Sequence, residues 1–267
     1  MAVAEAGNHL NFTYKVTGQY KPVVTWSKFE GRLPISRNIM SGGNLIIMNA
    51  ITNDSGSYVY TATSIVGSSS SSVQLQVHSA LKFITRPPSY VLVYAGQTLN
   101  LSCSASSGLK TTVTWVFNGT LSLPEGSATD ADNLIVALLA NITHGGNYTC
   151  SAMNALSSLY ANVIVHVKIP ETCSSLKTNI SDVSGDYDIV PDGDQGGAPF
   201  MEYCNMTYKE GIGVTAVSHD SQERIRVKGF GEKGSYQRDI HYVGSSLSQL
   251  KGLTEVSKSC QQFIKYG

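Results

Sequence analysis

The chain has 267 residues, enough for two or three domains at about 100 to 150 residues per domain. Its 19 Lys and Arg balance its 19 Asp and Glu, and only 14% of its residues are charged, which argues against a nucleic-acid binder. The longest apolar run, 134–140, is far shorter than the roughly 20 residues of a membrane-spanning helix, so we expect no membrane insertion within this chain.

Asparagine and cysteine usage indicates an extracellular protein. Eight N-x-S/T sequons offer acceptors for N-linked glycans, and the five cysteines lack the CxxC spacing of metal or redox sites. The first residues lack the basic and apolar stretches of a signal peptide, and we expect this to be an interior fragment of a longer ectodomain. The predicted glycosylation sites are Asn11, Asn53, Asn100, Asn118, Asn141, Asn147, Asn179 and Asn205.

An internal repeat organises the first 169 residues. At an offset of 89 residues Trp26 falls on Trp115, and at an offset of 90 Tyr58 falls on Tyr148. Both copies contain short stretches in which apolar and polar residues alternate, which predicts antiparallel strands with one buried face. The sequence therefore predicts two tandem β-sandwiches, at 1–79 and 80–169.

The second copy carries a specific set of spacings. Cys103 is followed by Trp115 twelve residues later, and the Tyr-x-Cys motif of Tyr148 and Cys150 follows 33 residues after that. These residues resemble an immunoglobulin domain, in which the tryptophan packs against a disulfide between the two sheets. The resemblance implies a Cys103–Cys150 disulfide and core positions for Trp115 and Tyr148.

The first copy matches the same pattern without the cysteines. Tyr14 and Tyr60 stand at the two cysteine positions, while Trp26 and Tyr58 are retained. Packing of Tyr14 and Tyr60 in the core against Trp26 is the favoured interpretation, and a functional tyrosine pair is the alternative. Strand parity also places Asn11 and Asn100 on the solvent side, because their neighbours in the alternating pattern are apolar.

The glycine and serine run at 67–72 resembles a flexible linker in composition. The repeat aligns it, without a gap, on 157–162, which covers the hairpin between the last two strands of the second copy and the start of the last strand. We therefore predict an exposed turn at 67–72.

A different module begins at Cys173. Its ordered motifs resemble the opening of a fibrinogen-like domain, in the version found in contactin-associated proteins of the neurexin superfamily. The resemblance implies a partial α+β fibrinogen-like module at 170–267. With it we predict a Cys173–Cys204 disulfide and an unpaired Cys260, whose partner would lie beyond Gly267. The motifs lie at 173–176, 184–193, 199–207, 218–221, 226–229, 236–239, 247–250 and 260–266.

Catalytic and metal-binding patterns are weak. The adjacent residues Ser218, His219 and Asp220 have the residue types of a hydrolase triad, but neighbours on an extended strand point to opposite faces. The aspartates between 182 and 194 do not fit the calcium-loop template, so solvated turn residues are the favoured interpretation and a Ca²⁺ site is the alternative. The alternating basic residues at 224–228 favour a solvated strand face, with a patch for heparin or an acidic partner as the alternative. We predict no catalytic residues, no metal site and no cofactor.

The combined pattern predicts a mainly β, non-enzymatic, extracellular or cell-surface fragment. We expect it to act in adhesion or recognition by contact with a protein partner on a cell surface or in the extracellular matrix, and a second copy of the chain is one option. A secreted fibrinogen-related immune lectin with immunoglobulin domains is the alternative function. No nucleic-acid partner is expected.

Overall fold

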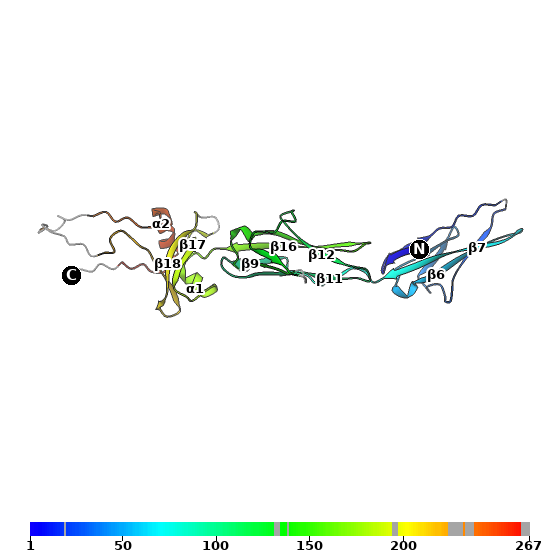
Figure 1. The fold of residues 1–267 in the computed structure, drawn as a ribbon, viewed down its shortest axis with the longest axis horizontal. Coiled ribbons are helices and arrows are strands. Elements are labelled where there is room, and N and C mark those ends of the chain that lie inside the picture. The colour runs from blue at the N-terminus through cyan, green and yellow to red at the C-terminus, as the bar shows by residue number, and fades with distance from the viewer. Residues whose placement is uncertain are drawn as a thin grey trace.

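The computed structural model describes residues 1–18, 20–130, 134–137, 139–193, 197–223, 232 and 238–262, with the backbone alone at 134–136. Figure 1 shows three parts arranged end to end: two sandwiches of strands, and a C-terminal part that contains both α-helices. Within the described residues, no helix is long and apolar enough to span a membrane.

The first sandwich has two facing sheets, ordered β1-β7-β6-β3 and β2-β5-β4. β1 runs parallel to β7, and the other pairs are antiparallel. The strands and the one short 3-10 helix are β1 (Ala2–Glu5), β2 (Leu10–Phe12), β3 (Val23–Lys28), β4 (Asn38–Ser41), β5 (Asn44–Ile47), η1 (Thr52–Asp54), β6 (Gly56–Ser64) and β7 (Gly67–His78).

The core of the first sandwich follows the predicted alternation. Phe12, Leu45 and Tyr58 are buried between the sheets, and Trp26 packs with them. The polar neighbours on the same strands, such as Asn11, are exposed. Removing this apolar surface from water is the main term that stabilises the sandwich.

The serine run does not form the predicted turn. β7 begins at Gly67, and its serines pair with β6 in an unbroken antiparallel register. The turn is confined to the residues between Ser64 and Gly67. Serine composition favours a turn locally, but pairing with the neighbouring strand overrides that preference. The side chains of 67–72 are exposed, as expected.

The second sandwich repeats the plan, with sheets ordered β12-β15-β16-β9 and β10-β14-β13 and a small β11-β8 pair. Its elements are β8 (Lys82–Thr85), β9 (Tyr90–Tyr94), β10 (Leu99–Ser102), β11 (Ser104–Ser106), β12 (Thr112–Phe117), β13 (Ser127–Thr129), β14 (Leu134–Ala137), η2 (Ile142–His144), β15 (Gly146–Met153) and β16 (Ser158–Lys168).

The C-terminal part combines helices with a small sheet. Its antiparallel sheet has the order β17-β18-β19, and helix α1 packs against β19. Its elements are α1 (Cys173–Asn179), β17 (Gly185–Ile189), β18 (Phe200–Lys209), β19 (Ile212–Ala216) and α2 (Leu247–Val256). The basic stretch at 224–228 lies outside the described residues.

Candidate functional site

The second sandwich is closed by a disulfide between its two sheets. Cys103 and Cys150 are bonded with a Cα–Cα distance of 6.5 Å, and both are buried. Trp115 is Cα partner to Cys150 across β12 and β15 and packs in the same cluster. The Tyr148 hydroxyl donates to the carbonyl oxygen of His144 at 2.9 Å, and burial raises the Tyr148 pKa to about 12.

In the first sandwich, an aromatic cluster takes the place of the bridge. The rings of Tyr14 and Tyr60 are 6.3 Å apart, and Trp26 lies 5.3 Å from Tyr60. Trp26 Nε1 donates to the carbonyl oxygen of Gly43 at 2.8 Å. Tyr14 and Tyr60 are half-buried and pack against the core, so each ring contributes less than a fully buried one.

Gly43 makes room for this cluster. A Cβ added to Gly43 would lie 2.4 Å from Cε1 of Tyr14, and the residue has a φ of 86°, in the left-handed region that favours glycine. The Tyr14 hydroxyl reaches the neighbouring Gly42 carbonyl oxygen at 3.4 Å. The turn between β4 and β5 therefore shapes the pocket for the tyrosine that replaces the cysteine.

The first sandwich also contains an ion pair that the sequence interpretation missed. Both guanidinium nitrogens of Arg37 donate to the Asp54 carboxylate, at 2.7 and 2.9 Å, and the Ile51 amide donates to it at 2.8 Å. Asp54 is buried, with 4% of its surface exposed. Burial raises the Asp54 pKa, but the hydrogen bonds from Arg37 and Ile51 and the Arg37 charge outweigh it, so the pKa is lowered.

The second sandwich has no charge at the equivalent positions. The 90-residue offset places Ser127 on Arg37 and His144 on Asp54. The Asn141 amide donates to His144 Nδ1 at 3.1 Å, much as the Ile51 amide donates to Asp54. Among the described residues, Ser127 Oγ and His144 Nε2 are buried without a hydrogen-bond partner. The Arg37–Asp54 ion pair therefore has no charged counterpart at these positions of the second sandwich, and the Cys103–Cys150 disulfide has no counterpart in the first.

A buried carboxylate lies where the two sandwiches meet. Glu5, at the end of β1, accepts hydrogen bonds from Asn154 Nδ2 at 2.6 Å and from Ser157 Oγ at 3.0 Å. A backbone hydrogen bond also crosses the joint, since the Gly108 amide donates to the Ser79 carbonyl oxygen at 2.9 Å. These contacts join two loops of the second sandwich, which follow β15 and β11, to the end of β1 and to the residue after β7 in the first sandwich.

The second sandwich also contacts the C-terminal part. Gln97 Nε2 donates to the Asn179 carbonyl oxygen, at the end of α1, at 2.7 Å. Lys168, at the end of β16, forms an ion pair with Glu171 at 2.9 Å.

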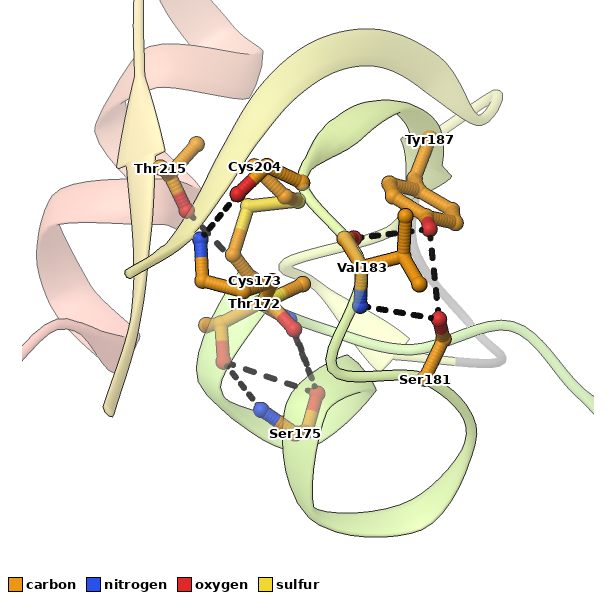
Figure 2. The surroundings of a disulfide bond; sticks show 10 residues. Thr172, Cys173, Ser175, Ser181, Val183, Tyr187, Cys204 and Thr215 are labelled. Carbon is orange, nitrogen blue, oxygen red and sulfur yellow. Dashed lines mark hydrogen bonds between the residues drawn. A yellow bond between two sulfur atoms is a disulfide. The ribbon is translucent and has the colours of Figure 1, made fainter. Parts of the chain in front are cut away.

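A second disulfide holds the C-terminal part together, and Figure 2 shows its surroundings. Cys173, the first residue of α1, is bonded to Cys204 on β18, with a Cα–Cα distance of 5.3 Å. The Thr172 hydroxyl caps α1 by accepting from the Ser175 amide at 3.1 Å. Cys260 is free and exposed.

The eight sequons lie at the surface to different degrees. Asn205 is half-buried, and its side-chain oxygen accepts hydrogen bonds from the Thr207 and Tyr208 amides. The other seven asparagines are exposed, and they are Asn11, Asn53, Asn100, Asn118, Asn141, Asn147 and Asn179.

The residues with catalytic or metal-binding side chains do not converge. His219 Nδ1 accepts from the Ser221 amide at 3.0 Å, whereas the Asp220 carboxylate lies 3.2 Å from His241 Nδ1. Within the described part of the chain, no group of three or more His, Cys, Asp or Glu side chains could hold a metal ion. Asp194, in the predicted acidic cluster, lies outside the described residues.

Comparison with protein families decides what the two sandwiches are. A family model described as the immunoglobulin I-set domain matches residues 1–77, and one described as an immunoglobulin domain matches residues 83–154. These segments are two tandem immunoglobulin domains.

Three relatives illustrate where such domains occur. Human hemicentin-1 is 26% identical over 75% of this chain and 4% of its own length. A human protein named as a probable oxidoreductase is 30% identical over 56% of this chain and 10% of its own length. Chicken neuronal cell adhesion molecule is 30% identical over 60% of this chain and 13% of its own length. The chain spans a small fraction of each of these relatives.

Proposed function

We propose that this chain is an extracellular adhesion or recognition segment that acts by protein–protein contact. The observation that carries the proposal is the pair of immunoglobulin domains joined end to end, with their sheet faces exposed and the Glu5 carboxylate buried in the joint. Contact surfaces on such domains lie on sheet faces and end loops, which the rigid cores hold in place. The similarity to a neuronal cell adhesion molecule supports this assignment.

The non-enzymatic part of the proposal rests on the same domains, whose fold is typical of non-enzymatic adhesion proteins. The similarity to a probable oxidoreductase covers a tenth of that protein, so its named activity does not extend to this chain. We further propose that residues 170–267 are the first part of a fibrinogen-like module. Motifs from 173–176 through 260–266 support this assignment.

A binding assay with immobilised chain tests the function. Beads coated with the full chain should bind to cells or to an extracellular matrix preparation, and trypsin treatment of the target should remove the binding. Matched beads that carry the same amount of an unrelated protein are the control. Binding that survives trypsin but is competed by simple sugars would favour the lectin function. No binding to cells, to matrix or to other beads coated with the same chain would refute the proposal.

Glycan placement is part of the same proposal. Asn11 and Asn100 point outward from β2 and β10, so both should carry glycans in protein secreted from animal cells. Asn205 should be poorly occupied, because its side-chain oxygen already accepts hydrogen bonds from the backbone. Glycopeptide mass spectrometry gives the occupancy at each site. Bare Asn11 and Asn100 beside an occupied Asn205 would contradict this assignment.

A further inference from the structure

Part of strand β7 in the first immunoglobulin domain is paired on one side only. β7 pairs with β6 along 67–75, but β1 covers only 75–78 on its other side. Within the described residues, no strand pairs with the outer edge of 67–74. The second domain shows the same arrangement with chain present before the corresponding strand: β9 pairs with β16 only along 164–168, and no described strand covers the outer edge of 158–163. Backbone amide and carbonyl groups along such an edge are available to another strand.

This edge lacks the features that usually prevent strand pairing. The stretch 64–76 contains no charged residue and no proline, and the pairing of β7 with β6 has no bulge. The exposed side chains of 67–72 are glycine and serine, which do not obstruct an approaching backbone. The equivalent stretch of the second domain, 158–162, differs because it presents Tyr160 with 59% of its surface exposed.

Because this edge carries no charge, a second copy of the chain is the favoured partner for it. When two identical strands pair about a two-fold axis, residues near the axis face themselves or their near neighbours, so a charge there would meet a like charge. An axis at Ser70 would place the serines of 68–72 opposite one another and Gly67 opposite Val73. The apolar turn residues Ile65 and Val66, which are 83% and 75% exposed, would then lie alongside the partner's sheet.

The direction of β7 fixes how two such chains would be arranged. β7 starts at the outer end of the molecule, at the turn that follows β6, and ends at the joint with the second domain (Figure 1). Antiparallel pairing of two β7 edges therefore sends the second domains in opposite directions. This is the arrangement needed by molecules that meet from opposing surfaces.

The sequons leave this sheet uncovered. Neither sequon of the first domain lies on β1, β3, β6 or β7, since Asn11 is on β2 and Asn53 is in η1. In the second domain, Asn147 lies on β15, in the corresponding sheet. If the sequons are occupied, the first domain offers the less shielded sheet.

We infer that two copies of this chain associate by antiparallel pairing of their β7 edges along 67–74, with the two chains extending in opposite directions. The inference rests on the proposed adhesive function and names a second copy as the partner.

Self-association of the full chain tests it, in a Cys260→Ser background that removes the exposed thiol. Sedimentation over a concentration series should show a reversible dimer. Ser70→Lys should weaken dimerisation at least tenfold, because the lysines would meet near the axis. Thr25→Lys is the matched control and should leave the dimer intact, since Thr25 lies exposed in the same cross-strand row but on β3, at the opposite edge of the sheet. An unchanged thermal midpoint shows that each variant is folded.

Single cysteines placed along 68–72 in the same background locate the contact. Positions near the axis should form a disulfide-linked dimer under mild oxidation, and Thr25→Cys should not. A chain that stays monomeric, a dimer that Ser70→Lys does not weaken, or cross-linking at Thr25→Cys alone would overturn the inference. Beads that bind cells while the chain stays monomeric would refute β7 pairing and leave the proposed function standing, with another protein as the partner.

Discussion

In the second immunoglobulin domain the Cys103–Cys150 disulfide joins the two sheets, and no charged pair accompanies it at the Ser127 and His144 positions. In the first domain tyrosines stand at the cysteine positions, and the Arg37–Asp54 ion pair is present. Both domains keep the buried tryptophan and the buried tyrosine whose hydroxyl donates to a carbonyl oxygen four residues earlier. The comparison shows that both domains keep the buried tryptophan and tyrosine, while among the described residues the disulfide and the ion pair each occur in one domain only.

The largest effect is expected on removing the disulfide. Replacing both Cys103 and Cys150 with alanine should lower the unfolding free energy of the second domain by about 2–5 kcal/mol, because a 47-residue separation is no longer constrained in the unfolded chain. The first domain should keep its stability. The chain has two tryptophans, one in each domain, so Trp26→Phe leaves Trp115 fluorescence as a probe of the second domain alone. An equal loss of unfolding free energy in both domains would contradict the conclusion that the disulfide stabilises the second domain alone.

Truncating the aromatic cluster should cost somewhat less. Tyr60→Ala removes the ring that contacts both Tyr14 and Trp26, and it should lower the stability of the first domain by about 3 kcal/mol. The estimate is at the lower end for large aromatic truncations because Tyr60 is half-buried. Chemical denaturation of a Trp115→Phe chain, followed by Trp26 fluorescence, measures the change. Tyr20→Ala, at an exposed tyrosine of the same domain, is the control and should change little. A Tyr60→Ala chain as stable as its parent would show that the cluster does not replace the bridge.

A smaller effect should follow from moving the ion pair into the second domain. His144→Asp alone should destabilise that domain by about 1–3 kcal/mol, because it buries a carboxylate without a cation. Adding Ser127→Arg should recover most of the loss, since these positions correspond to Asp54 and Arg37. A double-mutant cycle measured through Trp115 fluorescence should give a coupling of about 0.5–3 kcal/mol. A double variant that is no more stable than His144→Asp would show that the ion pair of the first domain cannot be transferred to positions 127 and 144 of the second.

The sequence predicts which side chains are buried and which are exposed wherever apolar and polar residues alternate along a strand. Burial of Tyr58 and Tyr148 and exposure of Asn11 and Asn100 follow from alternation along single strands, which the backbone geometry enforces. The Arg37–Asp54 pair was missed because it joins an irregular segment to a turn, where no periodicity applies. The repeat still held a signal, since the offset of 90 sets this pair against two uncharged residues.

The serine run at 67–72 is a segment whose structure the sequence does not predict. Its composition suggests a linker and its place in the repeat predicts a turn, but pairing with β6 makes it a strand. That pairing is not visible in the local composition of the run. The structure of the C-terminal part is harder to predict from the sequence, because its short elements follow no regular alternation of apolar and polar residues. There the Cys173–Cys204 bridge and the capped start of α1 determine local structure.

The difference between the two domains, a disulfide in the second and an ion pair in the first, is tested most directly by unfolding the whole chain in reductant and at low pH. Trp26 fluorescence reports the first domain and Trp115 fluorescence the second. Asp54 has a lowered pKa in the folded state, so the ion pair contributes stability above about pH 4, and this contribution is lost as the pH falls through the folded-state pKa. Reductant should therefore lower the unfolding midpoint reported by Trp115 and leave that of Trp26 unchanged. Acidification from pH 5 to pH 3 should lower the Trp26 midpoint more than the Trp115 midpoint, and Arg37→Ala should remove that difference. A Trp26 midpoint that moves with reductant, or equal acid shifts in both domains, would contradict the account.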